Sequence, residues 1–147
     1  MSAFGGAAGG AAFGIVGGAA SPEGACPCGS GATYAACCGR FHGGEAAPTA
    51  EALMRSRYSA FAVGDEAYLL RTWHPRTRPD SLSLDPRHRW VRLEVLSSSA
   101  GGPGDEEGTV VYRATSRNAA GERHTMTETS RFTRRAGHWV YVDGDVD

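Results

Sequence analysis

The sequence predicts an α+β protein in which one concave antiparallel sheet wraps a long helix, preceded by a small cysteine-rich knuckle. Three observations lead to this fold class. Four cysteines cluster in a glycine-rich segment near the start of the chain. Apolar residues then recur with helical spacing over residues 49–73, and they alternate with polar residues over 90–143. Helices followed by a meander of strands are typical of the α+β class.

Composition places the chain among ordinary globular proteins. It has 147 residues, of which 41% are hydrophobic and 21% charged, and its net charge is -1. The length suits one domain with a small appendage. No apolar run approaches the roughly 18 residues of a membrane span, so we expect no membrane association. Because the chain has no overall positive charge, nucleic acid is not indicated as a partner.

Residues 1–24 are expected to form a disordered Gly/Ala-rich tail. Thirteen of the 21 glycines fall within the first 44 residues, and such a segment buries too little side chain to offset its ordering entropy. A secretory signal peptide is the alternative, with residues 19–21 near a cleavage point. No Lys or Arg precedes Arg40, so the basic region that begins a signal peptide is missing. We therefore favour a tail.

The four cysteines form two close pairs in the segment CPCGSGATYAACCGRFH. Disulfides are one explanation, and they would require an oxidising compartment. A bridge within either close pair strains the disulfide geometry, and cross-pairing would staple only a short loop. Four thiolates on a glycine-rich turn suit tetrahedral Zn²⁺ better, and four protein ligands leave no open position, so the predicted zinc is structural. The predicted ligands are Cys26, Cys28, Cys37 and Cys38.

A zinc knuckle has two further implications. Structural zinc binds short peptides with about 10–16 kcal/mol, which is enough to fold a unit too small for its own core. Reduced thiolates and the lack of a convincing export signal predict a cytoplasmic protein. His42 lies close behind the cysteines and is a reserve ligand.

The segment C-P-C-G-S-G-x-x-Y-x-x-C-C resembles the SEC-C motif, which ends the SecA translocation ATPase and caps several small bacterial proteins. The resemblance implies a zinc knuckle over residues 25–44, with the four cysteines as its ligands. In SecA, the motif also touches an acidic partner through neighbouring basic residues. Only Arg40 and His42 lie nearby in this chain, so the resemblance identifies no protein partner.

Residues 45–147 form the predicted main domain, which begins with two helices. Thr49 is suited to cap the first helix, and Gly64 is suited to end it. A second helix is expected from Asp65 to Trp73, where the His74-Pro75 dipeptide stops it. The apolar face of the first helix comprises Leu53, Met54, Tyr58 and Phe61.

Four strands are expected after a Pro-interrupted connection. The first runs from Trp90 to Ser97, the second surrounds Tyr112, the third runs from Arg123 to Arg134, and the last from His138 to Asp143. Alternation places Val91, Leu93 and Val95 on one face of the first strand, and Val110, Tyr112 and Ala114 on one face of the second.

The alternation of the third strand puts Glu128 on the buried face, together with Met126 and Phe132. A buried carboxylate needs a partner or a raised pKa. Arg55 or Arg57 on the first helix is expected to pair with it. On the last strand, Trp139, Tyr141 and Asp143 share a face and are expected to line the same concavity.

Four segments of the main domain resemble the uncharacterised bacterial YchJ family. They are L-M-R-S-R-Y-x-A-F, Y-L-L-x-T-W-H-P, E-x-S-R-F and W-x-Y-x-D-G, within residues 53–144. That family joins a SEC-C knuckle to a domain similar to nuclear transport factor 2. The resemblance therefore implies a cone-shaped antiparallel sheet wrapped on a long helix, and it brings no established activity.

Two functions are compatible with these residues. The favoured one is a binding or interaction module with a structural zinc knuckle and a pocket in the cone, for a small ligand or protein partner not identified by the sequence. The other is a small isomerase, dehydratase or hydrolase that uses Glu128 as acid or base, assisted by Tyr58 or His74. The oligomeric state is not indicated. The predicted pocket residues are Arg55, Arg57, Tyr58, Trp73, Glu128 and Tyr141.

Overall fold

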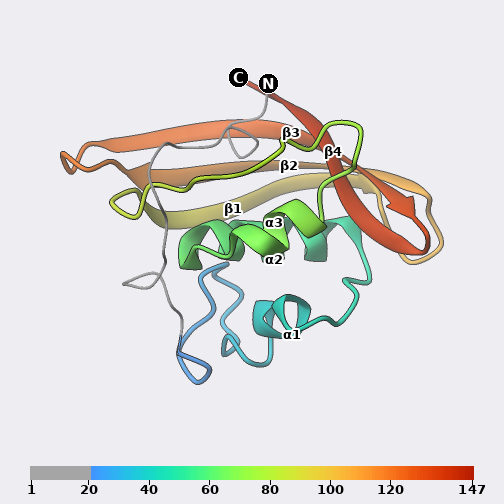
Figure 1. Cartoon of the computed structure of the whole chain (residues 1–147), viewed down its shortest axis with the longest axis horizontal. Helices are drawn as coiled ribbons and strands as arrows, with labels where there is room; N and C mark the ends of the chain where they lie inside the picture. The colour runs from blue at the N-terminus through green and yellow to red at the C-terminus, as the bar shows by residue number, and fades with distance from the viewer. Residues whose placement is uncertain (1–20) are drawn as a thin grey trace.

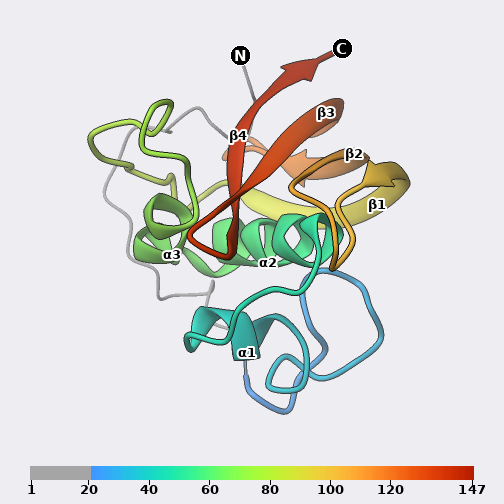
Figure 2. The same cartoon turned by 90° about the vertical axis from the view of Figure 1, so that its right-hand side faces the viewer.

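A computed structural model describes residues 21–147 (Figure 1). The tail predicted over residues 1–24 lies outside the described residues, except for its last four. The remainder is arranged in three layers, with the sheet above α2 and α3 and the cysteine-rich segment with α1 beneath them (Figures 1 and 2). No helix in the described part of the chain combines the length and apolar character needed to cross a membrane.

The capping residues mark the start of both predicted helices and the end of the first. The long helix α2, Ala50–Val63, starts at Thr49, whose side chain accepts a hydrogen bond from the Ala52 amide at 3.0 Å. It ends at Gly64, which adopts the left-handed conformation with φ 80°. Asp65 then caps α3, Glu66–Arg71, by accepting from the Tyr68 amide. Both predicted helices and the caps at Thr49, Gly64 and Asp65 are therefore confirmed, but α3 ends at Arg71, before the predicted end at Trp73. The short helix α1, Cys38–His42, precedes them.

Four antiparallel strands follow in the order β1-β2-β3-β4, which confirms the predicted meander. The sheet is open and curves over α2, so its concave face and the long helix enclose the core (Figure 2). Val110, Tyr112 and Ala114 all lie on this inner face, as expected. The strands are β1 Arg89–Ala100, β2 Glu107–Arg117, β3 Arg123–Arg135 and β4 His138–Val146.

Irregular pairing overturns one expectation for β1. Val91, predicted to face the core, is 45% exposed, whereas Leu93 is buried. The register shifts between Trp90 and Arg92 and again after Val95, so Val91 and Leu96 are extra residues on the strand. Each bulge reverses the facing of the side chains before it, and it is Trp90 rather than Val91 that packs against the core.

A similar shift changes the inner face of β4. Phe132 pairs with Tyr141, but its neighbour Arg131 pairs with Asp143, which leaves Val142 as the extra residue. Asp143, predicted to line the concavity, is exposed on the outer face and accepts a hydrogen bond from the Arg131 guanidinium at 2.6 Å. Gly144 is buried on the inner side in its place.

Candidate functional site

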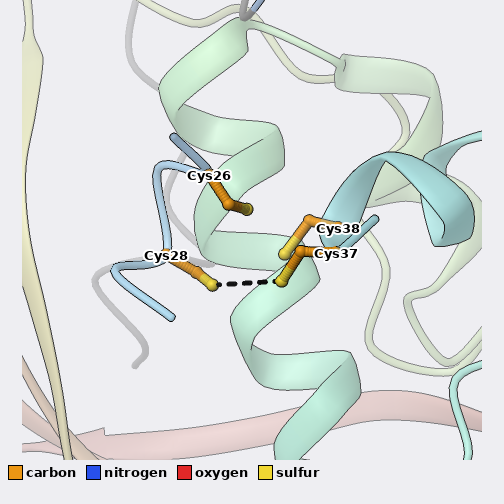
Figure 3. A group of neighbouring side chains, drawn as sticks. All are labelled: Cys26, Cys28, Cys37 and Cys38. Carbon is orange, nitrogen blue, oxygen red and sulfur yellow. Dashed lines mark hydrogen bonds between the residues drawn. The ribbon is translucent and has the colours of Figure 1, made fainter. Parts of the chain in front are cut away.

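The four cysteine sulfurs converge on one point beneath α2. All four Sγ atoms lie within 4.8 Å of one another, and Figure 3 shows them facing each other from two segments of the knuckle. Zn–S bonds of about 2.3 Å in a tetrahedron place sulfurs about 3.8 Å apart, and the Cys28 and Cys37 sulfurs are 3.7 Å apart. None of the four forms a disulfide, and only Cys37 is not fully buried. The donor set therefore fits a tetrahedral thiolate metal.

Two local features bring the pairs together. Gly29 and Gly31 have φ values of 79° and 92°, which let the chain reverse directly after the first pair. Cys37 and Cys38 stand at the start of α1, so the short helix directs both toward the first pair (Figure 3). The hydroxyl of Ser30 lies 3.2 Å from the Cys37 sulfur and gives that thiol a polar neighbour.

Neighbouring thiols in the cluster shift each other's pKa values in opposite directions. Hydrogen bonding from Cys28 and Cys38 lowers the pKa of the Cys26 thiol well below its usual range. The same contact with Cys26, together with burial, raises the pKa of Cys28 and of Cys38. The Cys26 thiolate therefore forms readily while Cys28 and Cys38 resist ionisation, because a second buried negative charge beside the first is unfavourable. A divalent cation is the group that would stabilise the remaining thiolates.

His42, the reserve ligand, is engaged elsewhere. Its Nδ1 lies 2.6 Å from the Tyr34 hydroxyl, and its Nε2 lies 2.8 Å from the Ser56 carbonyl oxygen. The ring also packs on Tyr68 at 4.6 Å between centroids. His42 therefore joins the knuckle to α2 and α3 instead of supplementing the four sulfurs.

Arg55 also fastens the knuckle, which corrects its predicted role. Its Nε donates to Glu51 at 3.1 Å and its Nη1 donates to the Cys28 carbonyl at 3.2 Å. Glu128 is not among its partners. Arg55 therefore lies on the side of α2 that meets the cysteines, away from the concave face of the sheet.

Glu128 is fully buried, as its strand position predicts, but its partners are tyrosines. The hydroxyls of Tyr112 and Tyr141 donate to its two carboxylate oxygens. The expected ion pair with Arg57 is not formed. Arg57 instead donates to the Leu69 carbonyl at 2.8 Å and to the Thr72 hydroxyl at 2.7 Å. Two hydroxyl donors thus replace the water that the buried carboxylate has lost.

Arg57 shares the interior with Glu128. Its guanidinium lies over the rings of Trp73 and Tyr141, 4.9 Å and 4.7 Å from their centroids. Burial lowers the pKa of Arg57 to about 10, so the group stays charged at neutral pH. Arg57, Glu128 and Tyr141 border a void of about 10 Å³, which has room for about one water molecule. Side chains therefore fill this part of the cone.

The remaining residues predicted for the pocket or for catalysis each lie in a different environment. Tyr58 is buried with its ring edge toward Trp90, and burial raises its pKa. His74 Nδ1 accepts a hydrogen bond from the Arg76 amide at 3.0 Å, within a turn. Trp73 lies between Arg57 and an outer groove. Neither Tyr58 nor His74 borders the void beside Glu128.

The outer groove is a feature that the sequence did not predict. It has a volume of about 460 Å³ and lies between the end of the knuckle, α3 with the loop after it, and the β3–β4 hairpin. No motif marks it, because its walls come from segments nearly a hundred residues apart in the chain. Residues on these walls include Phe41, Ala47, Arg71, Trp73, Arg78, Arg135, His138 and Trp139.

Both the main domain and the cysteine-rich segment match known protein families. Residues 49–144 match the family described as the YchJ middle, NTF2-like domain, and residues 25–40 match the SEC-C motif. A UPF0225 protein of Streptomyces coelicolor is 58% identical over 125 residues, which cover 84% of this chain and 97% of the relative. A UPF0225 protein of Corynebacterium glutamicum is 53% identical, with 83% and 97% covered.

Two solved structures have the same fold. The solution structure of a SEC-C motif containing protein from Rhodopseudomonas palustris matches with a TM-score of 0.69 and 35% identity, covering 82% of this chain and 96% of that one. The crystal structure of a SEC-C motif containing protein from Psychrobacter arcticus matches with a TM-score of 0.63 at 24% identity, covering 83% and 82%. The second likeness concerns the fold alone.

Proposed function

This chain belongs to the UPF0225 (YchJ) family, and from that premise we propose that it is a zinc-stabilised binding protein. Cys26, Cys28, Cys37 and Cys38 hold one structural Zn²⁺. The ion fixes the SEC-C knuckle against α2, and the seam between the knuckle and the main domain is the binding surface. The convergence of four sulfurs within 4.8 Å is the observation that carries the proposal.

The burial of the site supports a structural metal. Three of the four cysteines are buried, and the Cys26 sulfur lies 3.6 Å from the Ser59 hydroxyl on α2. A catalytic zinc keeps a position open for water or substrate, whereas four thiolates close the shell. The knuckle also shares one hydrophobic core with the main domain through Phe41 and Leu53. A metal that fixes the conformation of the knuckle would therefore also fix the surface where the knuckle meets the main domain.

The closed interior supports binding at the seam. Catalysis by Glu128 would require a cavity beside it that admits a substrate. The void there measures about 10 Å³, whereas the groove at the seam measures about 460 Å³. Glu128, Arg57 and Tyr141 accordingly act as a structural cluster in this proposal, and Tyr58 and His74 have no catalytic role. A reduced zinc-thiolate site is consistent with the cytoplasm, where thiols stay reduced, and we include that location in the proposal.

Elemental mass spectrometry of the reduced, purified protein tests the metal. We expect about one zinc per chain in the wild type. Cys37→Ser should retain less than about a tenth of that amount, because removing one of its four ligands costs a tetrahedral site most of its affinity. Ser30→Ala is the matched control: it removes a hydroxyl 3.2 Å from the same sulfur and should keep the zinc. The proposal would be overturned if wild-type protein purified without chelators contained no zinc and bound none when zinc was added.

A further inference from the structure

We propose that the groove at the seam binds a small organic anion with a flat, aromatic body and one carboxylate or phosphate group. The inference rests on the proposed binding role and names the class of ligand. Three properties of the groove carry it: an aromatic floor, a surplus of unpaired arginines, and a volume suited to one small molecule.

The floor is apolar and aromatic. The groove is lined by four aromatic rings that each expose only 2–4% of their surface: Phe41 from the knuckle, Tyr68 from α3, Trp73 from the segment after α3, and Trp139 from β4. Such rings favour a planar apolar body, because aromatic pairs gain energy beyond simple burial. The Trp73 indole Nε1 is buried without a hydrogen-bond partner in residues 21–147, so its desolvation is not offset.

The rim is positively charged. Arg71, Arg78 and Arg135 line the groove and are exposed. Within the described residues, the side chains of Arg78 and Arg135 have no ion pair or hydrogen bond, so their charges are available to a ligand. Glu45 is the acidic residue of the lining, and Arg40 already pairs with it at 3.3 Å.

The knuckle positions part of this rim. Arg71 Nη2 lies 3.4 Å from the carbonyl oxygens of Phe41 and His42, and its guanidinium lies over the Tyr68 ring at 4.8 Å. These contacts hold the Arg71 side chain against the seam. A guanidinium held in place by other contacts loses less entropy when it binds a carboxylate or phosphate. The charge pattern therefore selects an anion over a neutral ligand.

The volume suits a small molecule. About 460 Å³ lies within the range of about 300–1,000 Å³ that ligand pockets occupy. A second hollow of about 300 Å³ shares Pro75 and Arg78 with the groove and is also lined by Asp80. The aromatic body would lie on the floor, and the charged group would lie between Arg78 and Arg135 at the rim.

Two probes of the same shape test the charge requirement. We would titrate zinc-loaded, ¹⁵N-labelled protein with 2-naphthoate and with 2-naphthamide, which differ only in carboxylate against neutral amide. Two of the chain's three tryptophans line the groove, and Trp90 does not. Naphthoate should shift the indole N–H signals of Trp73 and Trp139, leave that of Trp90 in place, and bind at least about fivefold more tightly than the amide, an advantage that weakens as salt is added.

The variant Arg78→Ala/Arg135→Ala should weaken naphthoate binding about three- to tenfold and leave naphthamide binding unchanged. Arg76→Ala is the control, because it removes a positive charge from the same loop but does not line the groove. Equal binding of both probes at Trp73 and Trp139 would overturn the anion preference. Shifts confined to Trp90, or no shifts at all, would overturn the site. Zinc content measured on the same samples keeps either failure separate from failure of the metal proposal.

Discussion

Gly144 on β4 lies so close to the carboxylate of Glu128 on β3 that a Cβ atom at position 144 would overlap it. The two strands pair here, with Ser130 opposite Gly144. The missing side chain lets Glu128 stay fully buried, with the Tyr112 and Tyr141 hydroxyls as its donors. The W-x-Y-x-D-G segment therefore supplies both a tyrosine that binds the carboxylate and the space the carboxylate occupies.

Gly144→Ala should destabilise the protein by about 1–3 kcal/mol, because the added methyl group has no room beside the carboxylate. Urea unfolding followed by circular dichroism measures the change. Gly104→Ala is the control: a Cβ there meets no atom within 4 Å, so it should alter stability by less than about 0.5 kcal/mol. Equal stability of Gly144→Ala and the wild type would show that the strands do not pack as described.

The tyrosine–carboxylate cluster should behave as one unit. Tyr112→Phe and Tyr141→Phe each leave the buried carboxylate with one donor fewer, and each should cost about 1–3 kcal/mol. Combining Tyr112→Phe with Glu128→Gln should cost less than the sum of the single changes, because both remove the same hydrogen bond. Additive single and double changes in urea unfolding would contradict a direct contact. Neither tyrosine change should alter naphthoate binding, since the seam groove does not include these residues.

Removing the metal should loosen the knuckle before the main domain. A site saturated at a hundred times its Kd contributes about 2.7 kcal/mol, so chelation should lower the unfolding free energy by at least about that amount. Hydrogen exchange of the amides in α1 should speed up on chelation, while that of β2 and β3 changes less. Cys37→Ser should show fast exchange with or without chelator. Unchanged exchange in α1 after complete zinc removal would argue against a structural metal.

His88 should make stability depend on pH. Burial lowers its pKa from the ordinary 6.5, Asp85 opposes that shift, and His124 adds to it. Its Nε2 is buried without a partner in the described chain, and the ring lies against Trp90 at 4.8 Å. A depressed pKa means that the unfolded chain takes up the proton more readily. The stability that neutral His88 contributes is therefore complete above pH 6.5 and is lost as the pH falls below it.

Comparing the wild type with His88→Phe between pH 8 and 5 checks this expectation. Phenylalanine keeps the ring contact with Trp90 and cannot take up a proton. As the pH falls from 8 to 5, the free energy of unfolding should decrease more for the wild type than for His88→Phe. Parallel curves in urea unfolding would assign the pH dependence to other groups.

Local rules explain what was predicted correctly. Thr49, Gly64 and Asp65 act on the backbone within a few residues, so a helix cap can be recognised from sequence. The inward position of Glu128 followed from alternation along one regular strand. The same rule was wrong for Val91 and Asp143, because an extra residue in each strand shifts the register and side-chain alternation carries no mark of it.

Sequence patterns alone are enough to predict the α+β order, the helix caps at Thr49, Gly64 and Asp65, and the four-cysteine cluster, because each depends on residues close together in the chain. Three other features follow from the packing of distant segments: tyrosines rather than an arginine accompany Glu128, the cone is filled beside it, and a charged aromatic groove opens at the seam. These features join residues as distant as Phe41 and Trp139, and their contacts depend on how curved strands, helices and knuckle pack together. The spacing of residues along the chain does not predict these contacts between distant segments.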